Sequence, residues 1–409
     1  MHSDTTGLFR QGAFLRFLLA RAGGLLANQM LMVALAWHMY ELTASAWELG
    51  LVGLFQFVPA LLVALPAGQV VDRCHRGRIY AVCVLIQALV ALLMVTAVQE
   101  ASATRELILG VSVVLGVARA FQMPAQQAIT PLLVPQPLLA RAVALSSSSV
   151  QVAVIGGPAL GGLLYAHSAL TVYACCAFVL LLSAVLTLLV RLRQHAPAQA
   201  ATMDGLFAGL RFVWGHKLLL GAISLDLFAV LLGGAVALLP IYAKDILDTG
   251  PEGLGILRAA PAVGALMMSL ALTRWPLERH VGNRLLWAVT AFGLATVVFG
   301  LSTNFWLSVL ALTLTGAVDN VSVVVRITLM QLETPDDMRG RVASVNTIFI
   351  GASNQLGEFE SGAVAAVWGP VASAVSGGLG TLVVALLWRR WFPELAQRDR
   401  LTPQESALH

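Results

Sequence analysis

Ionisable side chains lie within long apolar stretches of this sequence, where they can bind protons or pair with one another. Asp226 and Asp319 are two carboxyl groups of this kind, and Arg119 and Arg326 are candidate partners for them. Burial favours the neutral form of a carboxyl group, whereas a nearby arginine favours the ionised form. A carboxyl group whose access to an arginine changes can therefore capture and release a proton. We interpret these four residues as proton-coupling candidates, and the choice between the two carboxyl groups stays open.

The spacing of two of these residues limits how they can pair. Asp319 and Arg326 are seven residues apart, which places them about 10 Å apart along one helix. That separation is too long for a direct bond. We therefore expect each of them to have a partner on another helix.

The composition places these charges in a membrane protein. The chain has 409 residues, of which 58% are hydrophobic and only 11% charged, and its mean hydropathy is +0.82. A soluble protein carries about 25% charged residues. Apolar windows of about 20 residues separated by short polar breaks predict twelve membrane-spanning helices. The predicted spans are 14–40, 46–70, 79–98, 106–133, 142–166, 169–190, 218–243, 252–273, 284–302, 305–331, 342–367 and 370–388.

The basic residues predict the orientation of these spans. Most of the 25 Lys and Arg residues lie on one set of alternate breaks, whereas the opposite breaks hold only Arg105 and Lys244. Positively charged loops face the cytoplasm. We therefore expect a multi-pass protein of the bacterial inner membrane with both termini cytoplasmic. The net charge of +4 is explained by this topology, so we expect lipid and not nucleic acid as the surrounding partner.

The longest polar break divides the chain into two sets of six spans. Within residues 191–217, apolar side chains recur on one helix face, which predicts an amphipathic helix at the cytoplasmic surface. The predicted parts are an N-terminal half (1–191), a linker (192–217), a C-terminal half (218–391) and a cytoplasmic tail (392–409). A shift of 198 positions aligns Ile129-Thr130 with Ile327-Thr328 and Arg141 with Arg339, as duplication predicts. The expected fold is an all-α membrane protein of two pseudo-symmetric six-helix halves.

Several motifs resemble those of the major facilitator superfamily, in its enterobactin-exporter-like branch of drug and siderophore proton antiporters. The stretch GQVVDRCHRGR (68–78) resembles the loop between spans two and three, and LGVARAFQ (115–122) resembles the signature of span four. The stretch GPALGG (157–162) resembles the span-five signature of antiporters, and GLRFVWGHKLL and TPDDMRGRVASVN also resemble this branch. The resemblance covers nearly the whole chain and implies the major facilitator fold.

The resemblance assigns roles to three further groups of residues. It implies a cytoplasmic latch, formed by Gly68, Asp72, Arg73, Arg76, Arg78, Arg339 and Arg341. It implies an antiporter-type helix with Gly157, Pro158, Gly161 and Gly162, although close packing of neighbouring helices explains these small residues equally well. It implies that spans one, four, seven and ten line a central cavity, and Arg21, Asn28, Gln29 and Gln122 lie on two of these spans as substrate candidates.

Four residues form a separate group in the predicted outer half of the membrane. Arg258, Asn354, Glu358 and Glu360 lie there, and an unpaired charge at this depth is costly. We expect Glu358 to face Arg258 or the seam between the halves. Either an outer gate or a static bridge between spans eight and eleven is consistent with this pattern.

These observations predict a secondary active transporter that exports a siderophore or an amphipathic drug-like molecule in exchange for protons. Proton-coupled uptake by symport and a non-transporting receptor or assembly factor are the alternatives. The sequence contains no Gly-Lys pair and therefore no phosphate-binding P-loop, and it contains no His-Glu-x-x-His motif. We therefore expect no enzyme activity, no cofactor and no metal. The small-molecule substrate and protons are the expected partners of a monomeric transporter.

Overall fold

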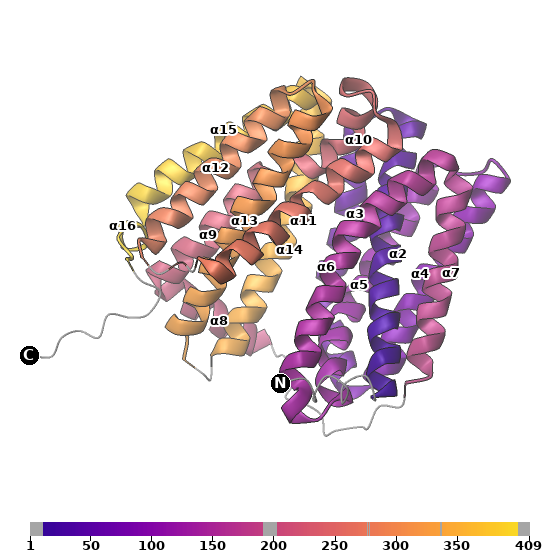
Figure 1. Ribbon diagram of the computed structural model, residues 1–409, viewed down its shortest axis with the longest axis horizontal. Helices are drawn as coiled ribbons and strands as arrows, with labels where there is room; N and C mark the ends of the chain where they lie inside the picture. The colour runs from indigo at the N-terminus through magenta and orange to yellow at the C-terminus, as the bar shows by residue number, and fades with distance from the viewer. Residues whose placement is uncertain (1–10, 191–202, 276, 278, 336–337, 400–409) are drawn as a thin grey trace, which may run out of the picture. The chain divides into compact units, whose positions relative to one another are not determined.

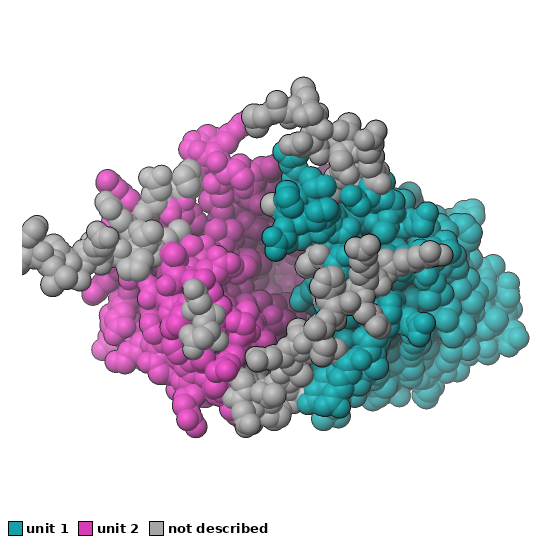
Figure 2. Space-filling model, turned by 90° about the horizontal axis from the view of Figure 1, so that it is seen from below, with its two compact units in different colours: residues 1–44, 55–201, 249–259 teal, residues 45–54, 202–248, 260–409 magenta. Residues whose placement is uncertain are grey.

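The computed structural model describes residues 11–190, 203–275, 277, 279–335 and 338–399, and every regular element within these ranges is helical. The helices are long and follow one another through short turns (Figure 1). They form two compact units, which are coloured separately in Figure 2. Unit 1 consists of Met1–Ala44, Phe55–Ala201 and Thr249–Ala259. Unit 2 consists of Ser45–Leu54, Thr202–Asp248 and Ala260–His409.

The first half of the chain folds into six long helices. They are α2 (Gly12–Thr43), α3 (Ala46–Arg73), α4 (Arg76–Gln99), α5 (Arg105–Leu133), α6 (Gln136–His167) and α7 (Ala169–Leu188). Helix α2 packs against α6 and α7, and α4 packs against α5 and α7. Polar caps fix where two of these helices begin, because the Thr104 and Ser168 side chains accept hydrogen bonds from backbone N–H groups of the first turns of α5 and α7.

The second half begins with a short helix and continues with the remaining long ones. They are α8 (Met203–Gly215), α9 (Lys217–Leu232), η1 (Ala235–Leu238), α10 (Leu239–Ile241), η2 (Tyr242–Ile246), α11 (Gly250–Arg274), α12 (Val281–Leu301), α13 (Phe305–Glu333), α14 (Arg339–Trp368), α15 (Pro370–Trp391) and α16 (Pro393–Ala396). Helix α9 packs against α14 and α15, and α12 packs against α13 and α15.

The packing of the two halves follows the same pattern. If α2, α4, α5, α6 and α7 are matched in order with α9, α12, α13, α14 and α15, each principal helix pair of the first half has its counterpart in the second. Each half must bury the same kind of apolar helix face. A duplicated sequence therefore repeats the same arrangement of packed helices. The prediction of two pseudo-symmetric six-helix halves is confirmed.

Eleven helical segments of the described chain are long and apolar enough to cross a membrane. They coincide with eleven of the twelve predicted spans. The exception is α14, which corresponds to the predicted span 342–367. At 30 residues it has the length to cross, but its polar residues, Glu358 and Glu360 among them, keep it out of this apolar set. Such a helix needs neighbours that satisfy its polar side chains.

The seventh predicted span is not a continuous helix. Helix α9 ends at Leu232, and the chain then passes through the 3₁₀ turn η1, the short α10 and the π-helical turn η2 before Ile246. The break falls at Gly233 and Gly234, and the added Cβ of Gly234 would lie 3.0 Å from the Gly357 backbone of α14. A close approach of this kind leaves no room for a side chain.

The compact units do not coincide with the two halves of the sequence. The first turns of α3 cluster with unit 2, and the first turns of α11 cluster with unit 1. The predicted domain boundaries stay a prediction. The predicted amphipathic segment is helical over Met203–Gly215, where Val213 is buried in the core of unit 2. Residues 191–202 of that segment lie outside the described part of the chain.

Candidate functional site

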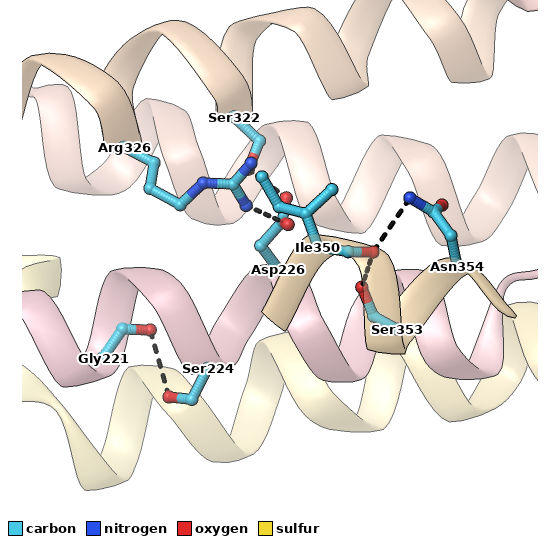
Figure 3. Close-up of polar contacts among 8 residues, drawn as sticks. All are labelled: Gly221, Ser224, Asp226, Ser322, Arg326, Ile350, Ser353 and Asn354. Atoms are coloured by element: carbon cyan, nitrogen blue, oxygen red, sulfur yellow. Dashed lines mark hydrogen bonds and ion pairs between the residues drawn. The ribbon is translucent and has the colours of Figure 1, made fainter. Parts of the chain in front are cut away.

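A buried ion pair lies within unit 2, between helices α9 and α13. Arg326 Nη1 pairs with Asp226 Oδ2, and Ser322 donates a hydrogen bond of 3.3 Å to Asp226 Oδ1 (Figure 3). Asp226, Arg326 and Ser322 are 6%, 2% and 3% exposed, so the pair is shielded from any solvent. Ser322 and Arg326 are four residues apart and therefore share the face of α13 that turns toward α9.

A small cavity adjoins this ion pair. Its volume is about 10 Å³, which is room for about one water molecule, and it is lined by Asp226, Ala229, Val230, Ala288, Val289, Phe292, Val318, Asp319 and Ser322. Sites for drug-sized ligands occupy about 300–1,000 Å³. The cavity therefore suits a proton or a water molecule better than a whole organic substrate.

The cavity brings both predicted carboxyl groups to one place beside a single cation. Asp319 lines the same space as Asp226, and unlike Asp226 it is partly exposed. With both carboxyl groups ionised, the two acids and Arg326 carry a net charge of −1, and one bound proton makes the cluster neutral. Because a net charge is costly to bury, this arrangement can hold and release one proton. The sequence-based expectation that Arg326 pairs with a residue on another helix agrees with this geometry.

A second polar cluster lies within unit 1, on helices α2, α4 and α5. Gln87 Nε2 donates to Gln122 Oε1 at 2.6 Å. With its amide oxygen turned toward the guanidinium group, Gln126 accepts from Arg21 Nε at 2.8 Å and from Arg21 Nη2 at 3.2 Å. Tyr80, which is fully buried, adjoins both Gln122 and Arg21. Arg21 and Gln122 thus belong to one polar cluster, and their role as substrate candidates stays a prediction.

Gln29, a third substrate candidate, lies where α2 meets α6. An added Cβ at Gly157 would lie 2.5 Å from Gln29 Cβ, and one at Gly161 would lie 2.9 Å from Met30 Cα. These glycines therefore let α6 contact α2 closely, and Pro158 lies within α6 between them. Asn28 and Gln29 are both partly buried.

Gly162 turns to a different neighbour from the other glycines of α6. Its added Cβ would lie 2.2 Å from the Pro251 carbonyl and 2.9 Å from Gly255 Cα, both in the first turns of α11 and within unit 1. The close-packing reading of the small residues is therefore supported for both faces of α6. The antiporter-type role of Gly157, Pro158, Gly161 and Gly162 stays a prediction.

Glu358 of α14 packs against the first turns of α3, within unit 2. A Cβ added at Gly53 would lie 2.9 Å from Glu358 Oε2, so Glu358 lies directly over this glycine. Asn354 donates to the Ile350 carbonyl at 3.0 Å, one turn earlier in α14 (Figure 3). Glu360 is partly buried. Arg258 belongs to unit 1, so the predicted gate with Glu358 is not a feature of either unit and stays a prediction.

The latch residues lie at the end of α3 and at the starts of α4 and α14. Arg73 and Arg78 are exposed, whereas Gly68 and Arg76 are partly buried, the latter at the start of α4. Arg339 Nε donates to the Gln331 carbonyl at 3.1 Å, and Arg341 Nη1 lies 3.3 Å from the Met338 sulfur. The side chain of Asp72 lies outside the described residues. The latch therefore stays a prediction.

One cluster of functional groups was missed by the sequence-based reasoning. Trp37 Nε1 and the Tyr165 hydroxyl donate to the two oxygens of Glu41 at 2.7 and 2.6 Å, and His38 Nδ1 lies 3.1 Å from the Tyr173 hydroxyl. Glu41 lies one residue beyond the predicted end of the first span, so it was not counted among the intramembrane charges. The spacing of Trp37 and Glu41 at i and i+4 is the only signal that sequence offers for the cluster.

Two repeated six-helix halves, apolar spans and buried charges define a membrane transporter of the major facilitator superfamily. Known proteins agree with this class. The chain belongs to the Transmembrane secretion effector family, whose model matches residues 4–405. The prediction of a transporter, and not an enzyme, is confirmed by this family.

Individual relatives cover almost the entire chain. The enterobactin exporter EntS of Escherichia coli O1:K1 is 28% identical over 406 residues, which are 97% of this chain and 95% of that protein. EntS of Shigella boydii serotype 18 is also 28% identical, over 404 residues. The resemblance to the enterobactin-exporter-like branch is confirmed.

Solved structures show the same fold. A bacterial homologue of the human lysosomal transporter Spinster covers 94% of this chain with a TM-score of 0.75 at 15% identity. A variant of the nucleoside transporter NupG covers 93% of it with a TM-score of 0.74, also at 15% identity. At this identity the likeness establishes the fold alone.

Proposed function

We propose that the protein exports a siderophore or an amphipathic drug-like molecule from the cytoplasm in exchange for protons, by alternating access. The family and the enterobactin exporters among its relatives support a secreted small-molecule substrate. The protein then lies in the bacterial inner membrane with both termini cytoplasmic, acts as an antiporter and works as a monomer. A range of substrates broad enough for multidrug efflux is part of this proposal.

The observation that carries the proposal is the pairing of two carboxyl groups with one arginine around a small cavity. Asp319 and Asp226 line the cavity, and Arg326 pairs with Asp226. In the proposed cycle, one proton neutralises the cluster when the cavity is open to the outside. The proton leaves to the cytoplasm after the transporter has changed its access. Asp319 is the preferred carrier, because Asp226 already has a charged partner.

The direction of proton-driven flux tests the proposal. In everted membrane vesicles the former outer face lies inside, and respiration acidifies that interior. We expect labelled enterobactin, the first substrate to try, to accumulate in vesicles that contain this protein and to be lost when the pH gradient is collapsed. Accumulation in right-side-out vesicles with an acidic exterior would instead establish uptake by symport. A secretion and drug-resistance profile of a deletion strain then identifies the natural substrate.

A further inference from the structure

Arg21 is a cation within the first membrane span that has no carboxylate partner in the part of the chain that the structure describes. Its hydrogen bonds there go to Gln126 alone, and the other group that its charge affects is the phenol of Tyr80. Arg326 in unit 2 differs, because Asp226 compensates its charge. A half-buried guanidinium group without a counter-ion is costly in a membrane protein. The cost is offset if an anion binds there.

The amides around Arg21 are oriented to act as donors. A glutamine side chain offers one acceptor oxygen and one NH₂ donor group. The Gln122 oxygen accepts from Gln87, and the Gln126 oxygen accepts from Arg21. Because each of these oxygens already accepts from a neighbouring side chain, the NH₂ groups of the two amides are the groups best able to contact an anion. Arg21 itself offers only N–H donors, and its Nη1 group has no partner among the described residues.

A further cation lies on the same helix as the two amides. Arg119, Gln122 and Gln126 occupy positions i, i+3 and i+7 of α5 and therefore share one face. The Arg119 side chain is exposed, and Gln122 and Gln126 are partly buried. The buried Gln87 and Tyr80 lie behind this face and hold Gln122 in place.

We propose that Arg21, Gln122 and Gln126 form a binding site for an oxygen-rich organic anion. This deepens the proposed function, on which it rests: the exported molecule presents a carboxylate or phenolate oxygen to Arg21. The site in unit 1 recognises the substrate, whereas the carboxyl groups in unit 2 carry the proton. Arginine suits the role because its planar fork can bind two oxygens at once.

Equilibrium binding to the purified full-length protein tests this site without any transport. Salicylate is the anionic probe, and salicylamide is its neutral counterpart of nearly the same size. At neutral pH we expect salicylate to bind at least tenfold more tightly than salicylamide. Arg21→Gln should remove this preference, and Arg21→Lys should keep part of it because the charge remains. Arg16→Gln is the matched control, since Arg16 is an exposed residue of the same helix.

Three results would overturn the proposal. They are no salicylate binding by the unaltered protein, equal affinity for the two probes, and an unchanged preference in Arg21→Gln. Far-ultraviolet circular dichroism and size exclusion establish that each variant is folded. If Arg21→Gln does not fold, the binding preference of Arg21→Lys tests the site instead. Binding at constant pH with no gradient does not depend on Asp319. A failure of proton coupling therefore leaves the binding result intact. A failure of anion binding likewise leaves the test of proton coupling intact.

Discussion

At the scale of single residues, the Asp226–Arg326 pair determines how unit 2 tolerates changes of charge. Both side chains are almost completely buried. Removal of one partner from a buried ion pair costs about 3–5 kcal/mol, because the remaining charge has no compensation. We therefore expect Asp226→Asn to lower the free energy of unfolding by about that amount. Denaturant titration in detergent, followed by intrinsic tryptophan fluorescence, measures the loss.

The double variant Asp226→Asn with Arg326→Gln is the control for that measurement. It removes both charges and keeps polar groups of similar shape, so it should regain most of the lost stability. If Asp226→Asn alone is as stable as the unaltered protein, the pair is not the buried bridge described here. Asp248→Asn makes the same chemical change at an exposed residue and should have no effect.

The sequence indicated which charges lie within the membrane spans but not how they pair. Asp226, Asp319 and Arg326 could be selected because charges are rare in apolar spans. The partner of each could not be predicted, because the rotation of α9 against α13 depends on packing along both helices. Gln87 and Gln126 were missed for a related reason. An amide in a span costs less than a charge, so its presence alone indicates little until a partner such as Arg21 or Gln122 is known.

At the scale of elements, glycines determine how closely α11 and α13 approach within unit 2. A Cβ added at Gly264 would lie 1.8 Å from the Thr313 carbonyl, and one at Gly316 would lie 1.8 Å from the Pro261 carbonyl. Neither backbone can move without separating the helices. We expect Gly264→Ala and Gly316→Ala each to lower the free energy of unfolding by about 1–3 kcal/mol or more. The same denaturant titration measures the effect.

Gly351 provides the matched control for these two substitutions. It lies within α14, and nothing is within 4 Å of an added Cβ. Alanine is a better helix former than glycine by about 1 kcal/mol, so Gly351→Ala should be neutral or stabilising. If all three alanine variants lost the same free energy of unfolding, the effect would come from helix propensity or sample preparation and not from close packing.

Helix existence was predictable, but helix continuity was not. Long apolar windows predict twelve helical segments. In the described chain, eleven of them are long and apolar enough to cross a membrane. The break of the seventh span was missed because its residues stay apolar through η1 and α10, so periodicity gives no signal. Gly233 and Gly234 could have suggested it, since paired glycines permit a close contact with another backbone.

At the scale of the whole molecule, the distribution of Arg and Lys predicts which ends of the helices face the cytoplasm. Cys74 is an exposed native thiol in the turn between α3 and α4, on the predicted cytoplasmic side. We expect it to resist an impermeant maleimide added to intact cells and to react after permeabilisation. Cysteine introduced at position 200 of the linker should behave in the same way. Ready labelling of either from outside would reverse the orientation.

Glu100→Cys serves as the opposite control for this topology. Glu100 is exposed in the turn between α4 and α5, on the predicted outer side. The cysteine introduced there should react in intact cells when Cys74 is replaced by serine.

The internal repeat also belongs to the scale of the whole molecule. The sequence shows it only at one loop and its flanks. The structure extends the repeat to every principal helix pair. Different residues can form the same helix packing, so the packing shows the repeat where the residue types do not.

The central claim is that proton movement through the Asp319 site drives export. The most direct measurement compares two modes of transport by Asp319→Asn in everted vesicles. One is accumulation of the labelled substrate driven by an acidic interior, and the other is exchange of labelled for unlabelled substrate at equal pH on both sides. The neutral amide resembles the protonated acid in charge and size. We predict that Asp319→Asn loses accumulation and keeps exchange, while Asp248→Asn retains both. Accumulation at the unaltered rate in Asp319→Asn would contradict the account, because the proton would then be carried elsewhere.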